Sequence, residues 1–115
     1  MPWRSTRPPS AAARAASKAL NMREKQAASN RGGTAVGIAR ARQFKNRERM
    51  SIAVIKRILS FFARHEKSPG SAKNRRDPTS KAAQAWGLWG GNSGRAWARK
   101  QLESYEKYKR SRSKN

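Results

Sequence analysis

The sequence has no cysteine, one histidine and only six acidic residues among 115. The absence of cysteine excludes disulfide bonds, thiol chemistry and cysteine-ligated zinc, and it is consistent with a reducing compartment. Six scattered carboxylates and the single imidazole of His65 do not supply the ligand cluster that a metal-dependent nuclease needs. We therefore expect a protein that is not an enzyme and that uses no cofactor and no metal.

Apolar residues are also scarce, at 36% of the chain, against about 45–50% in ordinary globular domains. This composition and length predict one domain with a small core. No apolar run approaches the ~18 residues of a membrane-spanning helix, and no secretory signal is recognisable. The best amphipathic segment is too rich in bulky core residues for a surface anchor. We expect no membrane association.

Positive charge, in contrast, is in large excess. Twenty-eight Lys and Arg residues leave a formal net charge of +22. Counted along the chain, the charge is +6 over residues 1–33, +7 over 34–68, +3 over 69–92 and +6 over 93–115. A chain this basic repels itself unless a polyanion offsets the charge. The composition therefore favours a nucleic-acid partner, contacted over most of the surface.

The sequence divides into three segments. Residues 1–9 contain three prolines and two arginines, which is typical of a flexible basic arm. Residues 10–110 are expected to form a single helical domain with its core at about 34–105, and residues 111–115 a disordered basic tail. Trp3, in the arm, is either an anchor into a neighbouring protein or simply exposed.

The first helix is expected over residues 10–28, with Ser10 as its N-cap. The segment is rich in alanine, but its only large apolar residues are Leu20 and Met22. We expect such a helix to dock weakly. Its bias towards Arg, Ala and Ser also matches a mitochondrial presequence, an alternative that composition leaves open.

Two helices are predicted after a breaker at Asn30–Gly33. Thr34 is placed to cap a helix over residues 35–47, and Ser51 to cap a central amphipathic helix over 51–66. The apolar side of the central helix comprises Ile52, Val54, Ile55, Ile58, Leu59, Phe61 and Phe62. Its opposite side comprises Lys56, Arg57, Ser60, Arg64 and Lys67. This periodicity makes it the main core helix.

The remaining sequence predicts a loop over residues 68–78 and a short helix from Thr79 or Ser80 to Leu88. After a break at residues 90–92, a last helix runs from Ser93 to about residue 110. No segment alternates with a period of two, so we expect no strand. The predicted fold class is all-α: a small helical bundle of about four to five short helices with disordered basic termini.

Three motifs resemble a short domain of tailed-phage proteins. The first runs from Asn30 to Gly37 and continues into Ala39-Arg40-Ala41-Arg42, the second is Ser60–Glu66, and the third joins Leu88–Asn92 to Gly94–Ala98. The resembling domain occurs in small phage proteins and within virion-associated polypeptides. The resemblance implies a phage context, with the virion or the infected host cytoplasm as location, but no reaction or ligand.

Two departures from that family increase the affinity expected for polyanions. The loop at residues 67–78 is shorter and more basic than the family pattern, and Asn92 occupies a position that is usually acidic. We expect phosphate contacts mainly from two successive basic helices and the start of the last one. The candidate residues are Arg40, Arg42, Lys45, Arg47, Arg49, Lys56, Arg57, Arg64, Arg95, Arg99 and Lys100.

Other motifs receive a structural interpretation. The two helices between Thr34 and Glu66 invite comparison with a helix-turn-helix, but the second begins with hydrocarbon where a recognition helix needs polar side chains. Trp86, Trp89 and Trp97 are assigned to the core rather than to base stacking. The residues 90–94 form a tight connection rather than a phosphate cradle, since the Gly-Lys-Ser/Thr ending of nucleotide-binding loops is missing.

Three functions remain open at this stage. The first is a DNA-binding protein that coats or condenses phage DNA without sequence preference, with DNA favoured over RNA. The alternative is a structural virion component, a capsid-lining or connector-associated protein held by contacts with phage subunits. The third is an RNA- or ribosome-associated binder. The oligomeric state is open, because a partner chain could complete so sparse a core.

Overall fold

The computed structural model describes residues 2–68 and 70–113. Within this part of the chain there are helices and no strand, so the predicted all-α class is confirmed. The elements are α1 (Ser10–Lys25), the 3-10 helix η1 (Ala28–Asn30), α2 (Ala35–Lys45), α3 (Ile52–Lys67), α4 (Ser71–Arg75), α5 (Lys81–Leu88) and α6 (Gly91–Ser113). The short helix α4 lies in the segment that we expected to be a loop.

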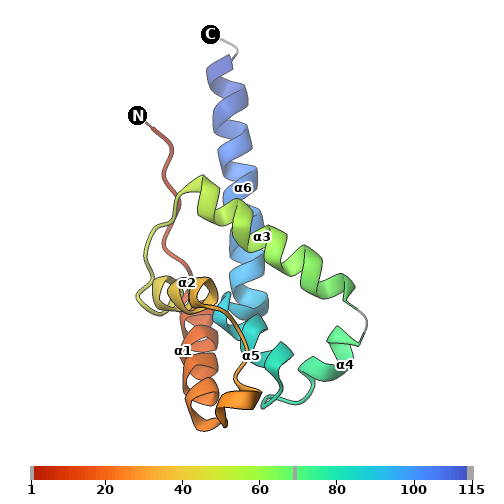
Figure 1. Cartoon of the computed structure of the whole chain (residues 1–115). Coiled ribbons are helices and arrows are strands. Elements are labelled where there is room, and N and C mark those ends of the chain that lie inside the picture. The colour runs from red at the N-terminus through yellow and green to blue at the C-terminus, as the bar shows by residue number, and fades with distance from the viewer. Residues whose placement is uncertain (1, 69, 114–115) are drawn as a thin grey trace.

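Two groups of helices share the long helix α6 (Figure 1). The helices α1, α2 and α5 pack together around its first turns, and α3 crosses it further along. The C-terminal half of α6 extends beyond both groups. As a result the molecule measures 55 × 29 × 21 Å with a radius of gyration of 15.1 Å, against about 13 Å for a compact domain of this length.

Three helices begin at hydroxyl caps that the sequence predicts. The side-chain oxygens of Thr34, Ser51 and Ser80 accept the backbone N–H groups three residues ahead, at 3.1, 3.2 and 3.1 Å. The last helix differs from expectation, because it begins at Gly91 and not at Ser93. Gly90 and Gly91 have φ of 97° and 62°, so these two glycines complete the reversal of the chain.

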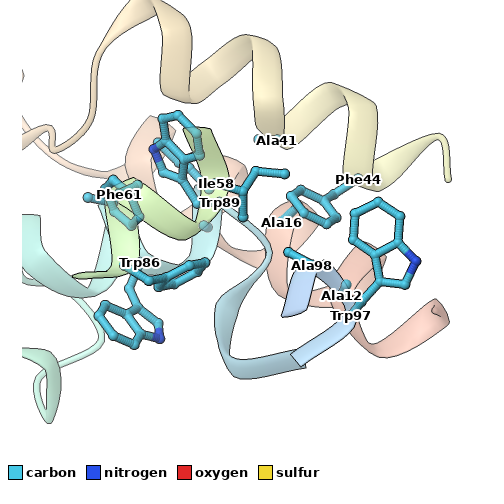
Figure 2. Packing of buried hydrophobic residues seen from close by; sticks show 14 of the residues in the cluster. Ala12, Ala16, Ala41, Phe44, Ile58, Phe61, Trp86, Trp89, Trp97 and Ala98 are labelled. Atoms are coloured by element: carbon cyan, nitrogen blue, oxygen red, sulfur yellow. The ribbon is translucent and has the colours of Figure 1, made fainter. Parts of the chain in front are cut away.

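The bulky core lies between α3, α5 and the start of α6. Phe62 is fully buried with its ring edge-on to Trp86 at 4.7 Å between centroids, and Phe61 stacks on Trp89 at 4.7 Å. Trp97 meets Phe44 of α2 edge-on (Figure 2). The exposed fraction is 9% for Trp86 of α5, 8% for Trp89 at the C-terminal end of α5, and 6% for Trp97 of α6. Their assignment to the core is therefore confirmed.

Helix α1 is part of the core, and the expectation that it docks weakly is wrong. Ala12 and Ala16 are fully buried, and Ala19 is nearly so. The neighbouring helix meets this alanine stripe with Gly87, where an added Cβ would lie 2.7 Å from the Cβ of Ala19. Small side chains on both sides let the backbones approach closely, so large apolar residues are not needed. The core thus begins at residue 12 and not at about 34.

The N-terminal arm also differs from expectation. Its described residues, 2–9, have no helical structure but are bound to the domain. Ser5 Oγ accepts the N–H of Met50 at 2.9 Å, and the N–H of Thr6 donates to Gln101 Oε1 at 3.0 Å. Pro8 is fully buried. Sequence composition misses these contacts because they join residues about 45 to 95 positions apart.

The basic C-terminal tail is only partly described. Helix α6 continues to Ser113, so residues 111–113 are helical where the sequence predicts a disordered tail. Residues 114–115 lie outside the described part of the chain. The ordered stretch adds Arg112 to the basic side chains of the last helix, and its Nη1 donates to the hydroxyl of Tyr108 at 2.7 Å.

Candidate nucleic-acid interface

In the described part of the chain, almost none of the positive charge is neutralised by an ion pair. Among residues 2–68 and 70–113 the structure contains one ion pair, between Arg95 of α6 and Glu66 of α3. The guanidinium of Arg95 also lies 5.8 Å from the ring centroid of Phe62 and 5.7 Å from that of Trp86. Arg95, predicted to contact phosphate, is thus occupied in joining two helices.

Arg47 is a second candidate that the structure uses internally. It has a φ of 50°, in the left-handed region, at the end of the turn after α2. Its Nε donates to the carbonyl of Pro8 at 2.7 Å, and its own carbonyl accepts from Arg7 at 3.2 Å. These bonds fasten the arm to the turn between α2 and α3, so Arg47 acts mainly as a link between two segments.

Arg40 lies at the junction of α2 and α3, half-buried against Trp89. Its Nη1 donates to Gln43 at 2.9 Å, and its guanidinium carbon is 5.9 Å from the Trp89 ring centroid. Its Nε is buried without a hydrogen-bond partner. Burial, and then the nearby charge of Arg57, lower the pKa of Arg40. Both causes disfavour the charged form of the Arg40 guanidinium.

The other eight candidates are exposed. They are Arg42 and Lys45 on α2, Arg49 before α3, Lys56, Arg57 and Arg64 on α3, and Arg99 and Lys100 on α6. Among the described residues, none of these eight side chains makes a hydrogen bond or an ion pair. Long cationic side chains without local partners remain available for phosphate oxygens. Their exposure is a finding of the structure; their contact with phosphate stays a prediction.

Basic residues that the sequence reasoning did not select extend this surface. The C-terminal half of α6 carries Lys107, Lys109, Arg110 and Arg112, all exposed. Lys109 Nζ of α6 and Lys56 Nζ of α3 lie 5.6 and 5.9 Å from the same Tyr105 ring centroid. Exposed cations of α3 and of the C-terminal half of α6 thus lie near the same ring. We call the exposed cations of α2, of α3 and of the C-terminal half of α6 the basic band. The dense Lys/Arg pattern after residue 106 was the available signal.

The structure does not favour a helix-turn-helix. Helix α2 packs mainly against α1 and α5, whereas α3 packs mainly against α6. The first turn of α3 also presents Ile52, Ala53 and Val54, of which the first and last are partly buried. A recognition helix instead projects polar side chains from its first turns into the major groove. The arrangement suits contact with the phosphate backbone better than contact with base edges.

The glycine-rich connection before α6 is filled by the protein itself. Gly90, Gly91 and Gly94 are buried, and a Cβ at Gly94 would lie 3.0 Å from the carbonyl oxygen of Trp89 and 3.2 Å from the Phe44 ring. The backbone here approaches its own neighbours, so there is no room for a phosphate. This agrees with the interpretation of residues 90–94 as a tight connection.

The single histidine serves packing. The ring of His65 stacks on Phe61 with centroids 4.0 Å apart, and its Nδ1 lies 2.9 Å from the Phe61 carbonyl oxygen. In the described segments no group of three or more His, Cys, Asp or Glu residues is placed to hold a metal ion. A search of the same segments finds no helix long and apolar enough to cross a membrane.

The three motifs that resemble the phage domain meet in space. A Cβ added at Gly37, from the first motif, would lie 3.2 Å from Trp89 Nε1, in the third. Phe61, from the second, stacks on the same tryptophan, and Glu66 pairs with Arg95. The motifs therefore build the core. Comparison with protein-family models, with curated proteins and with solved structures found no match, so the resemblance stays a prediction.

Proposed function

We propose that this protein binds nucleic-acid backbones without sequence preference, with phage DNA as the favoured partner. The observation that carries the proposal is the lack of internal neutralisation: within residues 2–68 and 70–113, a single ion pair joins a basic side chain to an acidic one. Cations left exposed on α2, α3 and α6 repel one another in the free protein. Phosphates offset that repulsion and release counterions from the nucleic acid when they are bound.

The dimensions of the protein suit a duplex. A length of 55 Å corresponds to about 16 base pairs at ~3.4 Å per base pair of B-form DNA. If the basic band engages six to ten phosphates, affinity should fall by about 10³–10⁵ between 50 and 200 mM salt. We therefore expect steep salt dependence and a site of roughly one and a half helical turns.

The rival function, a structural virion component, receives less support. It would require apolar surface to bury against capsid or connector subunits. The phenylalanines, Trp86, Trp89 and Trp97 are already buried in the protein's own core. Val36, 52% exposed, is the exposed large apolar side chain in the described part. The surface is thus richer in charge than in features that hold subunits together.

The test compares two variants of equal charge. In the first, Arg42, Lys45, Lys56 and Arg57 of the basic band become Gln; in the second, Arg14, Lys18, Lys25 and Lys73, exposed on α1 and α4, become Gln. Binding to 30-base-pair duplexes is measured over a salt series by fluorescence anisotropy. The first variant should lose up to about 3.6 from the slope of log K against log salt, on every duplex sequence. The second should lose much less.

Equal losses in both variants would show that total charge, and not the basic band, governs binding. Failure of the unmodified protein to bind any duplex at 50 mM salt would refute the proposed function. Binding to matched RNA duplexes and single strands is measured in the same salt series. Tighter binding to RNA than to DNA would mean that the partner is RNA.

A further inference from the structure

A surface pocket of about 470 Å³ lies where the N-terminal arm, the residues before α3 and helix α6 meet. Its volume is within the ~300–1,000 Å³ of small-molecule sites. Three of its lining residues are aromatic, namely Trp3, Tyr105 and Tyr108. All three are partly exposed, whereas the other tryptophans of the chain are buried. Trp3 packs against the edge of the core, but all three rings keep part of their surface exposed at the pocket.

The rings are held in place by ordinary contacts. Trp3 meets Tyr105 edge-on, with 5.3 Å between centroids, and Tyr105 lies 6.5 Å from Tyr108. The Nε1 of Trp3 donates to Ser104 Oγ at 3.1 Å, which fixes the indole against α6. The arm that carries Trp3 is itself anchored through Ser5 and Thr6. The aromatic surface is therefore preformed, and a ligand would meet little cost in ordering it.

The charged residues that line the pocket are basic. Arg4 and Arg49 line it and are exposed, and no acidic residue is among its lining residues. Lys56 and Lys109 flank the ring of Tyr105. Aromatic faces next to guanidinium and ammonium groups are the combination that single-strand binders use, since bases stack on the rings while cations hold the phosphates.

A second pocket, of about 340 Å³ between α1 and α5, has cations but little aromatic surface. Lys18 and Arg75 line it, and its one aromatic residue is Trp86. That ring is 9% exposed and is covered by the guanidinium of Arg75 at 3.8 Å. No ring face there is open to a ligand. The pocket at Trp3 therefore offers more open aromatic surface than the pocket between α1 and α5.

We propose that the pocket formed by Trp3, Tyr105 and Tyr108 takes an unpaired nucleobase, while Arg4 and Arg49 hold the adjoining phosphates. This inference rests on the proposed function, which it extends from backbone contact to the capture of a single unstacked base. The site is indifferent to which base enters, because every base has a face on which an aromatic ring can stack. A single-stranded or frayed segment is then bound more tightly than its charge alone dictates.

The experiment separates the base from the backbone. The full chain is titrated with a 20-residue thymidine oligonucleotide and with an abasic oligonucleotide of equal length and charge. We expect the base-bearing strand to bind about tenfold more tightly, within the ~5–150-fold range of one stacked base. Trp3 is partly exposed and the other three tryptophans are buried. The base-bearing strand should therefore also quench tryptophan fluorescence, and the abasic strand should not.

Two double variants locate the effect. Replacing Trp3 and Tyr108 by Leu removes two rings, and replacing both by Phe keeps them; helix content by circular dichroism checks the fold of each. The Leu variant should bind both oligonucleotides equally, and the Phe variant should keep the preference but lose the quenching from Trp3. Binding of 30-base-pair duplexes should change less than twofold in both.

The outcomes distinguish this inference from the function on which it rests. Equal and tight binding of both oligonucleotides by the unmodified protein overturns the base pocket and leaves backbone binding intact. A preference that persists in the Leu variant also overturns it, because the base would then be held elsewhere. No binding of any oligonucleotide or duplex overturns both proposals.

Discussion

Helices α1 and α3 have the same length of 16 residues but are held in the fold by opposite means. The buried face of α3 consists of large side chains such as Ile58 and Phe62, whereas that of α1 consists of alanines such as Ala12 and Ala16. The large side chains of α3 fill the space between its backbone and those of its neighbours. The small side chains of α1 let the neighbouring backbones approach closely, so little space is left to fill. The difference shows that the size of the apolar residues does not measure how firmly a helix is packed.

The two kinds of packing should respond to opposite substitutions. Where large side chains fill the core, a deletion leaves a cavity. Where small side chains meet, an added methyl or isobutyl group has nowhere to go, and backbones must move apart. Truncating a buried side chain should therefore destabilise the protein most on α3, and enlarging a buried side chain should destabilise it on α1.

The largest effect is expected from Phe62→Ala on α3. Phe62 is fully buried against Trp86, so truncation should lower the free energy of unfolding by about 3–5 kcal/mol. Urea denaturation followed by circular dichroism measures the loss. The exposed Ser60→Ala on the same helix is the control, with a change within about 0.5 kcal/mol. A loss below 1 kcal/mol at Phe62 would mean that α3 is not a main core helix.

A smaller effect is expected from Ala16→Leu on α1. Ala16 is fully buried, and the added carbons should lower the free energy of unfolding by about 1–3 kcal/mol through overpacking. Asn21→Leu places the same side chain on the exposed side of the helix and should be neutral within about 0.5 kcal/mol. If Ala16→Leu stabilised the protein, α1 would be loosely docked, as its composition first indicated.

The smallest effect concerns how the two helices begin. Ser51 Oγ caps α3 by accepting the N–H of Val54, whereas α1 begins after Pro9 without a side-chain cap. Ser51→Ala should therefore lower the unfolding free energy by about 1 kcal/mol, and Ser10→Ala should change it by less than half of that. Thermal unfolding of the two variants side by side checks the difference, and equal shifts would contradict it.

Much of the fold could be predicted from local patterns. The caps at Thr34, Ser51 and Ser80, the apolar face of α3 and the burial of the tryptophans all depend on residues within a few turns of one another. The docking of α1 could not be predicted, because it depends on Gly87, about 70 positions away. The attachment of the N-terminal arm could not be predicted for the same reason, since its hydrogen-bond partners lie on α6 and before α3.

The candidate site shows the same division. Exposure of Arg42 or Arg57 follows from helical periodicity, so the band of cations could be predicted from the sequence. The internal roles of Arg47 and Arg95 depend on Pro8 and Glu66, which only the fold brings near. Trp3 is the most instructive case. Its neighbours Tyr105 and Tyr108 are separated from it by nearly the whole chain, and no local pattern predicts their contact.

The attachment of the N-terminal arm to α6 has a consequence for how the protein is made. Trp3 and Thr6 are synthesised some 101 and 95 residues before their partners Ser104 and Gln101. At about 5–20 residues per second the arm waits on the order of 5–20 s for its binding site. Throughout that time the indole of Trp3 lacks the hydroxyl of Ser104, to which it donates in the folded protein.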